Sequence, residues 1–368
     1  MPSPSLIDRF RPEPAGRRLE DLETPVPVID LDIVERNLTR WQSHCDAAGL
    51  VNRPHIKTHK LVGLAQHQIA EGAKGITVQK LGEAEVMAAA GIRDMLLTFN
   101  IIGRSKLARL AALMRTTDIK VVADSEEIVS ALEEAAEAGG RRLAVLVECD
   151  TGAGRNGMQT PEDARRLARR IAGSPQLVFG GLMTYPKSGG RLAGAAFFEE
   201  AKDRLARDGI SVETVSSGGT PDMWSNEGLA PLTEYRAGTY IYHDRATVAA
   251  GAAKPEDCAL TVLATVVSRP HVDRAIVDAG SKALTSDLMG LTGFGSVADL
   301  NDAPIYNVNE EHGYLDVSRT NRKPRVGDLV RIVPNHVCPV SNLYDRIVLV
   351  AGGEVLGAVK VDARGMVT

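Results

Sequence analysis

The feature that most restricts how this chain can fold is a repeated alternation of short apolar runs with amphipathic segments between residues 24 and 237. The apolar runs have the length and the Val, Ile and Leu content of buried strands, and the segments between them place apolar residues at helical spacing. Strands that alternate with helices pair in parallel, because each helix returns the chain to the edge where the strand began. About eight such strands predict a TIM-type (β/α)₈ barrel, whose site lies beyond the carboxyl ends of the strands.

The limits of these elements can be read from turn residues and helix caps. The predicted strands cover residues 24–31, 75–78, 95–99, 120–123, 142–149, 177–183, 212–215 and 234–237. The predicted helices cover residues 32–48, 61–71, 81–90, 105–114, 126–138, 162–172 and 194–207.

The pattern changes after residue 250, where short Val- and Ile-rich runs are separated by turns rich in Gly, Asn and Asp. Such runs predict an antiparallel β domain. We therefore expect a barrel domain over residues 24–248 and a β domain over residues 249–368 that also includes the N-terminal segment 1–23. The expected strands of the second domain cover residues 260–268, 274–278, 329–333, 346–350 and 355–359.

Composition indicates small-molecule chemistry. The net charge of −4 and the pI of about 6.1 argue against binding to nucleic acid or to an anionic membrane. Residues 1–23 are polar and lack the apolar core of an export signal, and no run is long enough to span a membrane. The cysteines are far apart and form no CxxC pair, which indicates reduced thiols and a cytoplasmic protein: Cys45, Cys149, Cys258 and Cys338.

The densest group of chemically active side chains is the segment 53–60, Arg-Pro-His-Ile-Lys-Thr-His-Lys. A lysine at the mouth of a barrel, with a pKa lowered by burial and by neighbouring cations, can form a Schiff base. We predict that Lys57 has this role and that His59 belongs to the catalytic residues. The alternative is a solvated basic turn, since charge clusters usually lie on the surface.

Two further turns follow predicted strands and suit a phosphate. In Ser216-Ser217-Gly218-Gly219-Thr220-Pro221, backbone N–H groups and hydroxyls can face an anion without obstruction by side chains. Downstream, Gly238 allows close approach of the backbone, and the Tyr240 hydroxyl could reach the same phosphate. The alternatives are an ordinary Gly-Gly loop and tyrosines at the edge of the core.

Arg155 stands among glycines and small residues in the loop 150–157 after a predicted strand, and Tyr185 follows the end of the strand 177–183. We predict that both face the barrel mouth and contact a cofactor or a substrate, and that Tyr185 is a catalytic residue together with Lys57 and His59. An ordinary surface loop would account for Arg155 equally well.

His336 and Cys338 lie two residues apart in a segment that we expect to be an extended loop. Imidazole and thiolate together suit zinc better than magnesium, and a substrate oxygen, waters or a carboxylate would have to complete the coordination. The alternative is a buried structural cysteine beside a hydrogen-bonded histidine.

In this order, the segment 53–60, Gln79-Lys80, the Arg155 loop, Tyr185, the turn 217–220, Tyr240 and His336-x-Cys338 resemble the D-threonine aldolase and D-serine dehydratase group. These are pyridoxal-phosphate enzymes with an alanine-racemase-like fold, and the resemblance covers most of the chain. It implies that Lys57 carries the cofactor and that Arg155 and Tyr185 contact the cofactor or the substrate. It also implies a phosphate site at Ser217, Gly218, Gly219, Thr220 and Tyr240, and a divalent metal (Zn, Mn or Mg) at His336 and Cys338.

The activity implied is a retro-aldol cleavage of D-threonine-type substrates to glycine and an aldehyde. Aldolases of the group often show His-x-Asp, so His336-x-Cys338 keeps open a D-serine or D-3-hydroxyaspartate dehydratase, which would release a 2-oxo acid and ammonia. A racemase would need a second base and no metal, and a non-catalytic pyridoxal-phosphate carrier would resemble only the barrel half. The resemblance further implies a homodimer, and we expect the loop 309–313, with Glu310, Glu311 and His312, to reach the site unless it is a polar surface turn.

Overall fold

The computed structural model describes residues 5–16 and 18–368, so residues 1–4 and Arg17 of the N-terminal segment lie outside the described residues. The chain divides into two compact units that are not continuous in sequence. The barrel unit comprises residues 42–57, 68–238 and 366–368, and the β unit comprises the described residues up to 41 together with 58–67 and 239–365. The predicted division at residues 248 and 249 stays a prediction.

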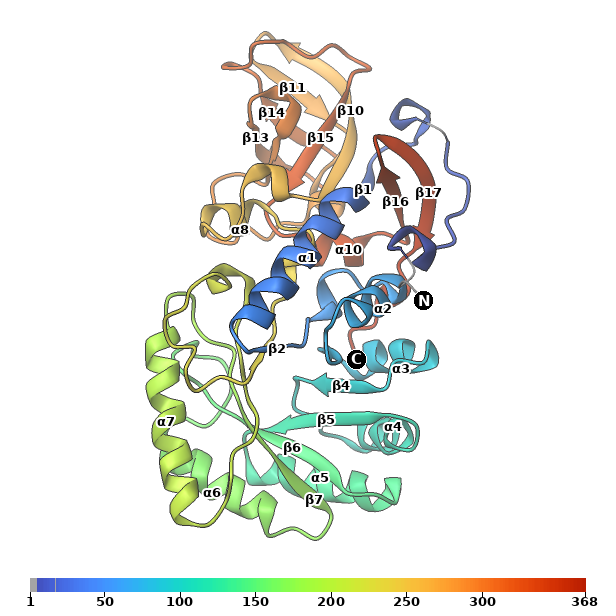
Figure 1. The fold of residues 1–368 in the computed structure, drawn as a ribbon. Coiled ribbons are helices and arrows are strands. Elements are labelled where there is room, and N and C mark those ends of the chain that lie inside the picture. The colour runs from blue at the N-terminus through green and yellow to red at the C-terminus, as the bar shows by residue number, and fades with distance from the viewer. Residues whose placement is uncertain (1–4, 17) are drawn as a thin grey trace. The chain divides into compact units, whose positions relative to one another are not determined.

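The barrel unit is built on parallel strands, eight of them within the described residues, in the order β2-β9-β8-β7-β6-β5-β4-β3 (Figure 1). A parallel bridge between His55 and Thr77, with the Thr77 N–H donating to the Pro54 carbonyl, joins the two ends of this order. The strands are β2 (Val51–Asn52), β3 (Ile76–Val78), β4 (Asp94–Leu97), β5 (Asp118–Ala123), β6 (Leu143–Glu148), β7 (Leu177–Met183), β8 (Val215–Ser217) and β9 (Glu234–Tyr235).

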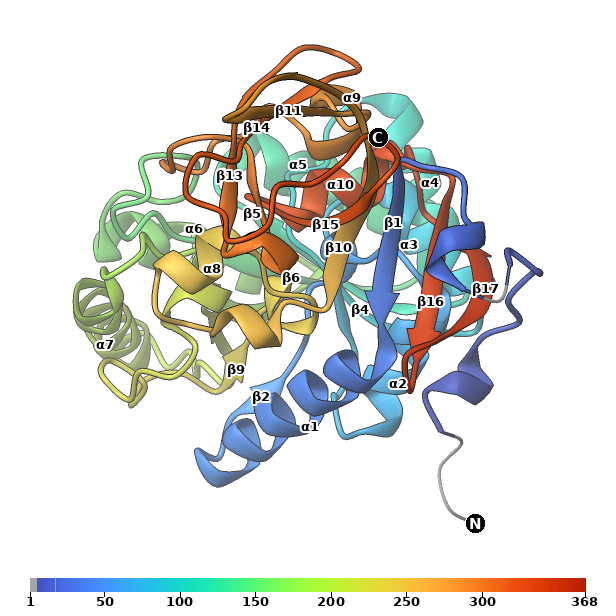
Figure 2. The same ribbon diagram turned by 90° about the horizontal axis from the view of Figure 1, so that it is seen from above.

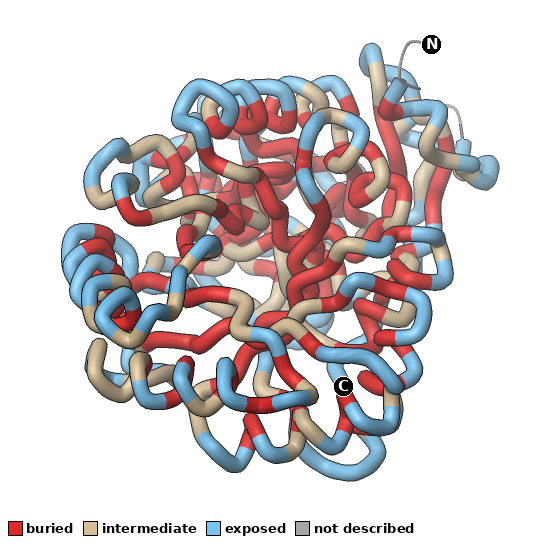
Figure 3. The backbone as a smooth tube through the Cα atoms, turned by 60° about the horizontal axis from the view of Figure 1, so that its bottom comes forward, coloured by how far each residue is buried: buried red, intermediate tan, exposed pale blue. Residues whose placement is uncertain are grey.

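Helices follow the strands, and their ends are set by local chemistry. Ser125 accepts a hydrogen bond from the Ile128 N–H at the start of α5, and Gly140 ends that helix in the left-handed conformation. Buried residues concentrate along the strands, whereas the outer turns of the helices are exposed (Figure 3). The helices are α2 (Val62–Ala70, of which only residues 68–70 belong to this unit), α3 (Leu81–Ala89), α4 (Arg104–Met114), α5 (Glu126–Gly139), α6 (Pro161–Ala172) and α7 (Arg191–Arg207).

The β unit contains a sheet with nine strands among the described residues, in the order β11-β14-β13-β12-β15-β10-β1-β16-β17, and β10 also pairs with β11 (Figure 2). Its strands are β1 (Val26–Asp30), β10 (Leu260–His271), β11 (Arg274–Val277), β12 (Gly295–Val297), β13 (Ala303–Val308), β14 (Gly313–Asp316), β15 (Leu329–Pro334), β16 (Arg346–Ala351) and β17 (Glu354–Lys360). Its helices include α1 (Leu31–Ala47, as far as Trp41), α8 (Arg245–Ala249), α9 (Ser281–Leu284) and α10 (Val337–Leu343). The predicted fold class, a TIM-type barrel with a C-terminal antiparallel β domain, is confirmed.

The first predicted barrel strand is placed differently. Residues 24–31 do contain a strand, but β1 pairs antiparallel with β10 and parallel with β16. The first barrel strand is β2, which has only two residues and therefore leaves no period-2 pattern in the sequence. Local pattern alone could not separate these cases, because β1 followed by α1 looks like any other βα unit.

A network of buried charged side chains lies in the interior of the barrel. Arg53 is 2% exposed, and its Nε and Nη1 donate to Glu234 Oε2 (2.5 Å) and Asp94 Oδ1 (2.6 Å). The Ser216 hydroxyl donates to Glu234 Oε1 (2.5 Å) and accepts from Arg236 Nη1 (2.6 Å). Burial lowers the pKa of Arg236 to about 10, although Glu234 favours its charged form. These contacts tie β2, β4, β8 and β9 to one another.

We expect Arg53→Leu to lower the free energy of unfolding by about 3 to 5 kcal/mol, because it leaves the buried carboxylate of Glu234 without its ion-pair partner, whereas Asp94 keeps Lys120. Urea denaturation measures this change. The matched control is Arg166→Leu, which removes an exposed ion pair with Asp163 on α6 and should cost less than about 1 kcal/mol. An Arg53→Leu cost as small as that of the control would contradict the role of this network.

Candidate functional site

Lys57 lies in a short 3₁₀ helix, Ile56–Thr58, directly after the carboxyl end of β2, where the sites of such barrels lie. Lys57 is half-buried, and its backbone N–H donates to His55 Nδ1 at 3.4 Å. His55 Nε2 is 3.1 Å from Gln79 Oε1, and Gln79 donates to the Thr98 carbonyl. The backbone that presents Lys57 is therefore fixed by side chains from the next two βα units.

His59 and Lys60 belong to the β unit. His59 is fully buried, and its Nδ1 accepts a hydrogen bond from the Leu61 N–H at 3.0 Å. Lys60 has a positive φ of 57°, and its Nζ donates to the Ala363 carbonyl. These contacts give Lys60 a structural role, whereas the predicted catalytic role of His59 stays a prediction.

The turn 217–220 follows β8 and has the form of an anion cradle. Gly218 has φ 102°, and a Cβ added there would lie 2.4 Å from the Tyr235 ring, so only glycine fits. The N–H groups of Gly218 and Gly219 donate to no group in the part of the chain that the structure describes. Ser217 and Thr220 are buried beside them, and the backbone donors and hydroxyls together fit a phosphate.

Arg155 and Tyr185 meet at the carboxyl ends of β6 and β7. The Arg155 guanidinium lies 5.2 Å from the centre of the Tyr185 ring, and a Cβ on Gly219 would lie 3.3 Å from that ring. Asp150 Oδ1 accepts hydrogen bonds from three successive N–H groups, at residues 152–154, and so shapes the loop that carries Arg155. The structure thus brings Arg155, Tyr185 and the Gly219 turn together, whereas their predicted contact with a cofactor or a substrate stays a prediction.

Glu148 is a residue of this site that the sequence analysis missed. It ends β6, its side chain is 1% exposed, and its Oε1 lies 3.5 Å from Arg155 Nη2. Its other oxygen, Oε2, is buried without a hydrogen-bond partner among the described residues. Burial raises the pKa of Glu148 to about 7, against the opposing attraction of Arg155 and Arg236. The available signal was an acidic residue at the end of an otherwise apolar strand.

We expect Glu148→Gln to change how stability depends on pH. The pKa of Glu148 in the folded protein lies above its ordinary value of 4.5. The stabilising contribution of the Glu148 carboxyl group to the free energy of unfolding is therefore fully present below pH 4.5 and is lost as the pH rises through about 7. Relative to the wild type, Glu148→Gln should therefore gain up to about 3 kcal/mol in free energy of unfolding between those pH values. Urea denaturation across pH 4.5–8 measures the difference, with the exposed Glu199→Gln on α7 as control. A difference that does not vary with pH would show that Glu148 is not held protonated.

His336 and Cys338 lie together in the β unit, but not in the extended loop that we predicted. His336 is the N-cap of α10, and Cys338 lies in the first turn of that helix, so the spacing is set by a helix start. Although burial lowers the pKa of His336, its hydrogen bond to Cys338 and the acidic groups around it raise the value to about 9. The imidazole and the thiol thus face each other, as a shared ion would require.

The surroundings of this pair fit a metal. His336 Nδ1 lies 2.6 Å from Asp287 Oδ2, which leaves Nε2 for an ion, an arrangement common among metal-binding histidines. Cys338 Sγ lies 3.2 Å from the Thr58 hydroxyl. Among the described residues, no third His, Cys, Asp or Glu completes a three-ligand group with this pair. The donor set therefore leaves coordination positions for water or substrate.

Two other predicted features also fall in the β unit. Tyr240 is 1% exposed, and its ring lies 5.9 Å from that of Trp41, so its predicted phosphate contact stays a prediction.

The loop 309–312 is the turn between β13 and β14, and its Asn309 and Glu310 carbonyls accept hydrogen bonds from residues 281 and 282 of α9. Because α9 ends three residues before Asp287, the turn 309–312 supports the segment that carries Asp287, the hydrogen-bond partner of His336.

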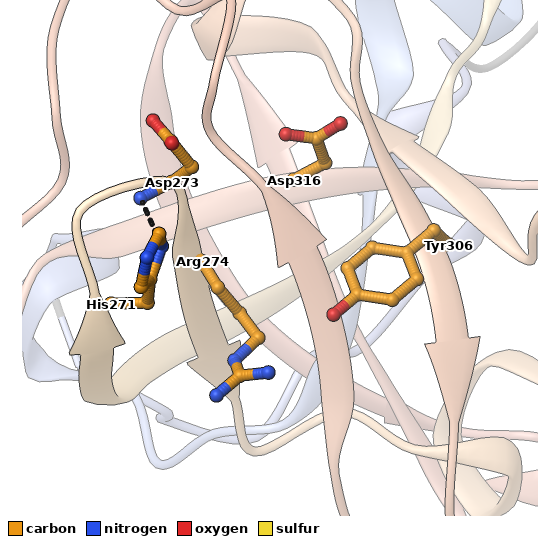
Figure 4. Close-up of a pocket in the computed structure, with 5 residues that line it drawn as sticks. All are labelled: His271, Asp273, Arg274, Tyr306 and Asp316. Carbon is orange, nitrogen blue, oxygen red and sulfur yellow. Dashed lines mark hydrogen bonds between the residues drawn. The ribbon is translucent and has the colours of Figure 1, made fainter.

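A separate surface pocket of about 430 Å³ lies on the sheet of the β unit and contains none of the predicted site residues (Figure 4). The Asp273 N–H donates to His271 Nδ1 there (3.2 Å), in the turn between β10 and β11. The pocket is lined by His271, Asp273, Arg274, Tyr306 and Asp316.

Comparison with known proteins identifies the family. Residues 29–246 match the alanine racemase N-terminal domain, and residues 259–350 match a putative serine dehydratase domain. A D-threonine aldolase from Arthrobacter sp is 35% identical over 370 residues, which cover 96% of this chain and 96% of that protein. The chain belongs to the D-threonine aldolase and D-serine dehydratase family. Members of this family are pyridoxal-phosphate-dependent lyases with the alanine-racemase-like fold, and this chain is such a lyase.

Solved structures of the family extend the likeness to nearly the whole chain. A D-threonine aldolase from Filomicrobium marinum superposes with a TM-score of 0.90 at 32% identity and covers 97% of this chain and 100% of its own. A D-threo-3-hydroxyaspartate dehydratase from Delftia sp. HT23 has a TM-score of 0.84 at 30% identity. The match covers 93% of this chain and 98% of that dehydratase. Structures of two D-threo-3-hydroxyaspartate dehydratase variants replace a histidine, or a cysteine numbered two positions further on, by alanine, and the cysteine variant is described as metal-free. Metal use therefore occurs in the family. Among the described residues of this chain, no helix is long and apolar enough to cross a membrane.

Proposed function

We propose that this lyase cleaves D-3-hydroxy amino acids of the D-threonine type to glycine and an aldehyde, with pyridoxal phosphate and a divalent metal. The observation that carries the proposal is that one chain combines a half-buried lysine at the mouth of a barrel with an imidazole–thiol pair whose members face each other. A cofactor carrier needs only the first of these features. A racemase has no use for the second.

Pyridoxal phosphate, when bound, supplies an electron sink for the negative charge that develops at the substrate Cα. Lys57 provides the amine that holds the cofactor. Ser217, Thr220 and the free N–H groups of Gly218 and Gly219 bind its phosphate. Arg155, kept in place by Glu148 and by the Tyr185 ring, faces the cofactor or the substrate carboxylate with a fixed positive charge.

A divalent metal at His336 and Cys338 supplies a Lewis acid that favours loss of the proton from the substrate β-hydroxyl. Asp287 fixes the imidazole with Nε2 available, and the thiol of Cys338 makes zinc the best match, ahead of manganese and magnesium. The substrate is thus required to carry a hydroxyl at Cβ. We infer by resemblance that the working form is a homodimer, and the four free cysteines support a cytoplasmic location.

A second candidate is dehydration of D-serine or D-3-hydroxyaspartate to a 2-oxo acid and ammonia. The specific observation in its favour is Cys338, because D-threo-3-hydroxyaspartate dehydratase variants were solved with a histidine and a cysteine replaced at the same spacing. In that reaction Lys57 Nζ would take the proton from Cα while the hydroxyl leaves from Cβ. Cleavage instead breaks the Cα–Cβ bond after the hydroxyl proton is lost, so the products distinguish the two.

We expect Lys57→Ala to lose the visible absorption of the bound cofactor and all turnover, because no other amine takes its place. Absorption spectroscopy and an assay of aldehyde release measure the two effects. The control is Lys60→Ala, which should keep the colour, since the Lys60 amine is engaged by the Ala363 carbonyl. A coloured, active Lys57→Ala enzyme would exclude Lys57 as the cofactor lysine.

We expect a chelator to abolish turnover of D-threonine and to leave the cofactor absorption unchanged, because metal and cofactor bind different groups of the protein. Adding zinc or manganese back should restore activity, and aldehyde should then exceed 2-oxo acid. A 2-oxo acid as the main product, from D-serine or D-3-hydroxyaspartate, would replace the aldolase by the dehydratase. Full activity in a metal-free preparation, or racemisation of D-alanine, would overturn the metal-assisted lyase altogether.

A further inference from the structure

Arg191 is a buried cation whose charge no residue of the described chain neutralises. It is the first residue of α7 and is 8% exposed. It forms no ion pair in the part of the chain that the structure describes. A buried charge without a counter-charge is strongly unfavourable, so such a guanidinium normally lies near an anion.

The hydrogen bonds of Arg191 use only one side of the guanidinium. Nη1 donates to the backbone carbonyls of Asp222 (2.7 Å) and Ser225. Nη2 is buried and donates to no group among the described residues. The Asp222 carboxylate is directed elsewhere, since it accepts a hydrogen bond from the Gly189 N–H. Nη1 therefore anchors the segment 222–225, whereas Nη2 lacks a hydrogen-bond acceptor among the described residues.

Arg191 borders the turn 217–220. A cavity of about 10 Å³, with room for a single water molecule, is lined by Arg191 together with Ser217 and Gly218. The guanidinium also lies 5.7 Å from the centre of the Tyr235 ring, and the Tyr235 hydroxyl donates to the Gly219 carbonyl at 2.9 Å. Arg191 thus lies close to the turn 217–220.

We propose that Arg191 neutralises the cofactor phosphate from beside the turn 217–220, through one water molecule in this cavity that links Nη2 to the cradle. The inference rests on the proposed binding of pyridoxal phosphate at that turn and adds a residue that no sequence motif indicates. Since arginine keeps its charge at any physiological pH, its effect does not depend on pH. Arg191 is a positioning residue, because it acts on the phosphate through the water and the backbone.

The test compares two ligands that differ only in the phosphate. Removing the charge with Arg191→Gln should weaken pyridoxal phosphate binding to the full-length protein, freed of cofactor, by ~10-fold or more, while pyridoxal binding stays unchanged. Absorption and fluorescence titrations give both dissociation constants without any substrate. The control is Arg142→Gln, which removes an arginine that also holds a backbone carbonyl, that of Leu177, and should change neither constant.

Arg191→Lys keeps the charge but loses the forked contact with the two carbonyls. It should retain pyridoxal phosphate affinity within about threefold if the charge matters. Equal weakening of both ligands in either variant would show that Arg191 only supports the segment 222–225, and unchanged affinities in Arg191→Gln would also overturn the inference. Because no turnover is measured, a failure of the lyase assay with an intact difference between the two ligands would leave this inference standing.

Discussion

The buried ion pair between Arg53 and Glu234 is the contact on which the barrel interior depends. Arg53 directly follows β2 and Glu234 begins β9, so the pair joins the first and last strands of the barrel in sequence. Glu234 in turn accepts from Ser216, and Ser216 accepts from Arg236. A charge buried among apolar strands persists only when each member is paired and hydrogen-bonded, which makes the geometry of these strands hard to alter. The turn 217–220 directly follows Ser216, so these contacts also hold the start of that turn in place.

The site uses a different electrostatic arrangement from the interior beneath it. In the interior, cations and carboxylates alternate and satisfy one another. At the carboxyl ends of the strands, two cations lack a fully charged partner: the exposed Arg155 has the partly protonated Glu148 close by, and the buried Arg191 forms no ion pair among the described residues. A buried cation without a counter-charge is unfavourable in the protein alone, and a phosphorylated ligand close to it would offset that cost. Stability and ligand affinity are therefore coupled at this end of the barrel.

The residues that sequence analysis identified share one property, because each follows a strand within a short, distinctive string. Sequence analysis proposed Lys57, Arg155, the glycines of the turn 217–220 and His336-x-Cys338 as site residues in this way. Asp287 and Arg191 could not, since their contacts are with residues distant in sequence: Asp287 meets His336 from 49 positions away. No local pattern carries such information. Glu148 was missed although it has a local sign, an acidic residue at the end of an apolar strand.

The fold was predictable to a similar extent. Helices with strong periodicity and caps, such as α5 and α6, were predicted to within a residue or two, and so were the long strands β6 and β7. The missed strands β12, β13 and β14 are short or irregular: β12 begins with Gly295, and Pro304 lies within β13. Strands of this kind form because their neighbours offer unpaired edges, and the sequence of the strand itself gives little sign of it.

The pairing of β1 has a consequence for how the chain is made. β1 occupies residues 26–30, but both of its neighbours, β10 and β16, come from the last third of the chain. During synthesis, the apolar edges of β1 have no native partner until more than two hundred further residues have been added. A nascent chain of this length is therefore exposed to chaperones and to mispairing for most of its translation. Fragments that stop after the barrel strands would carry the same unprotected strand.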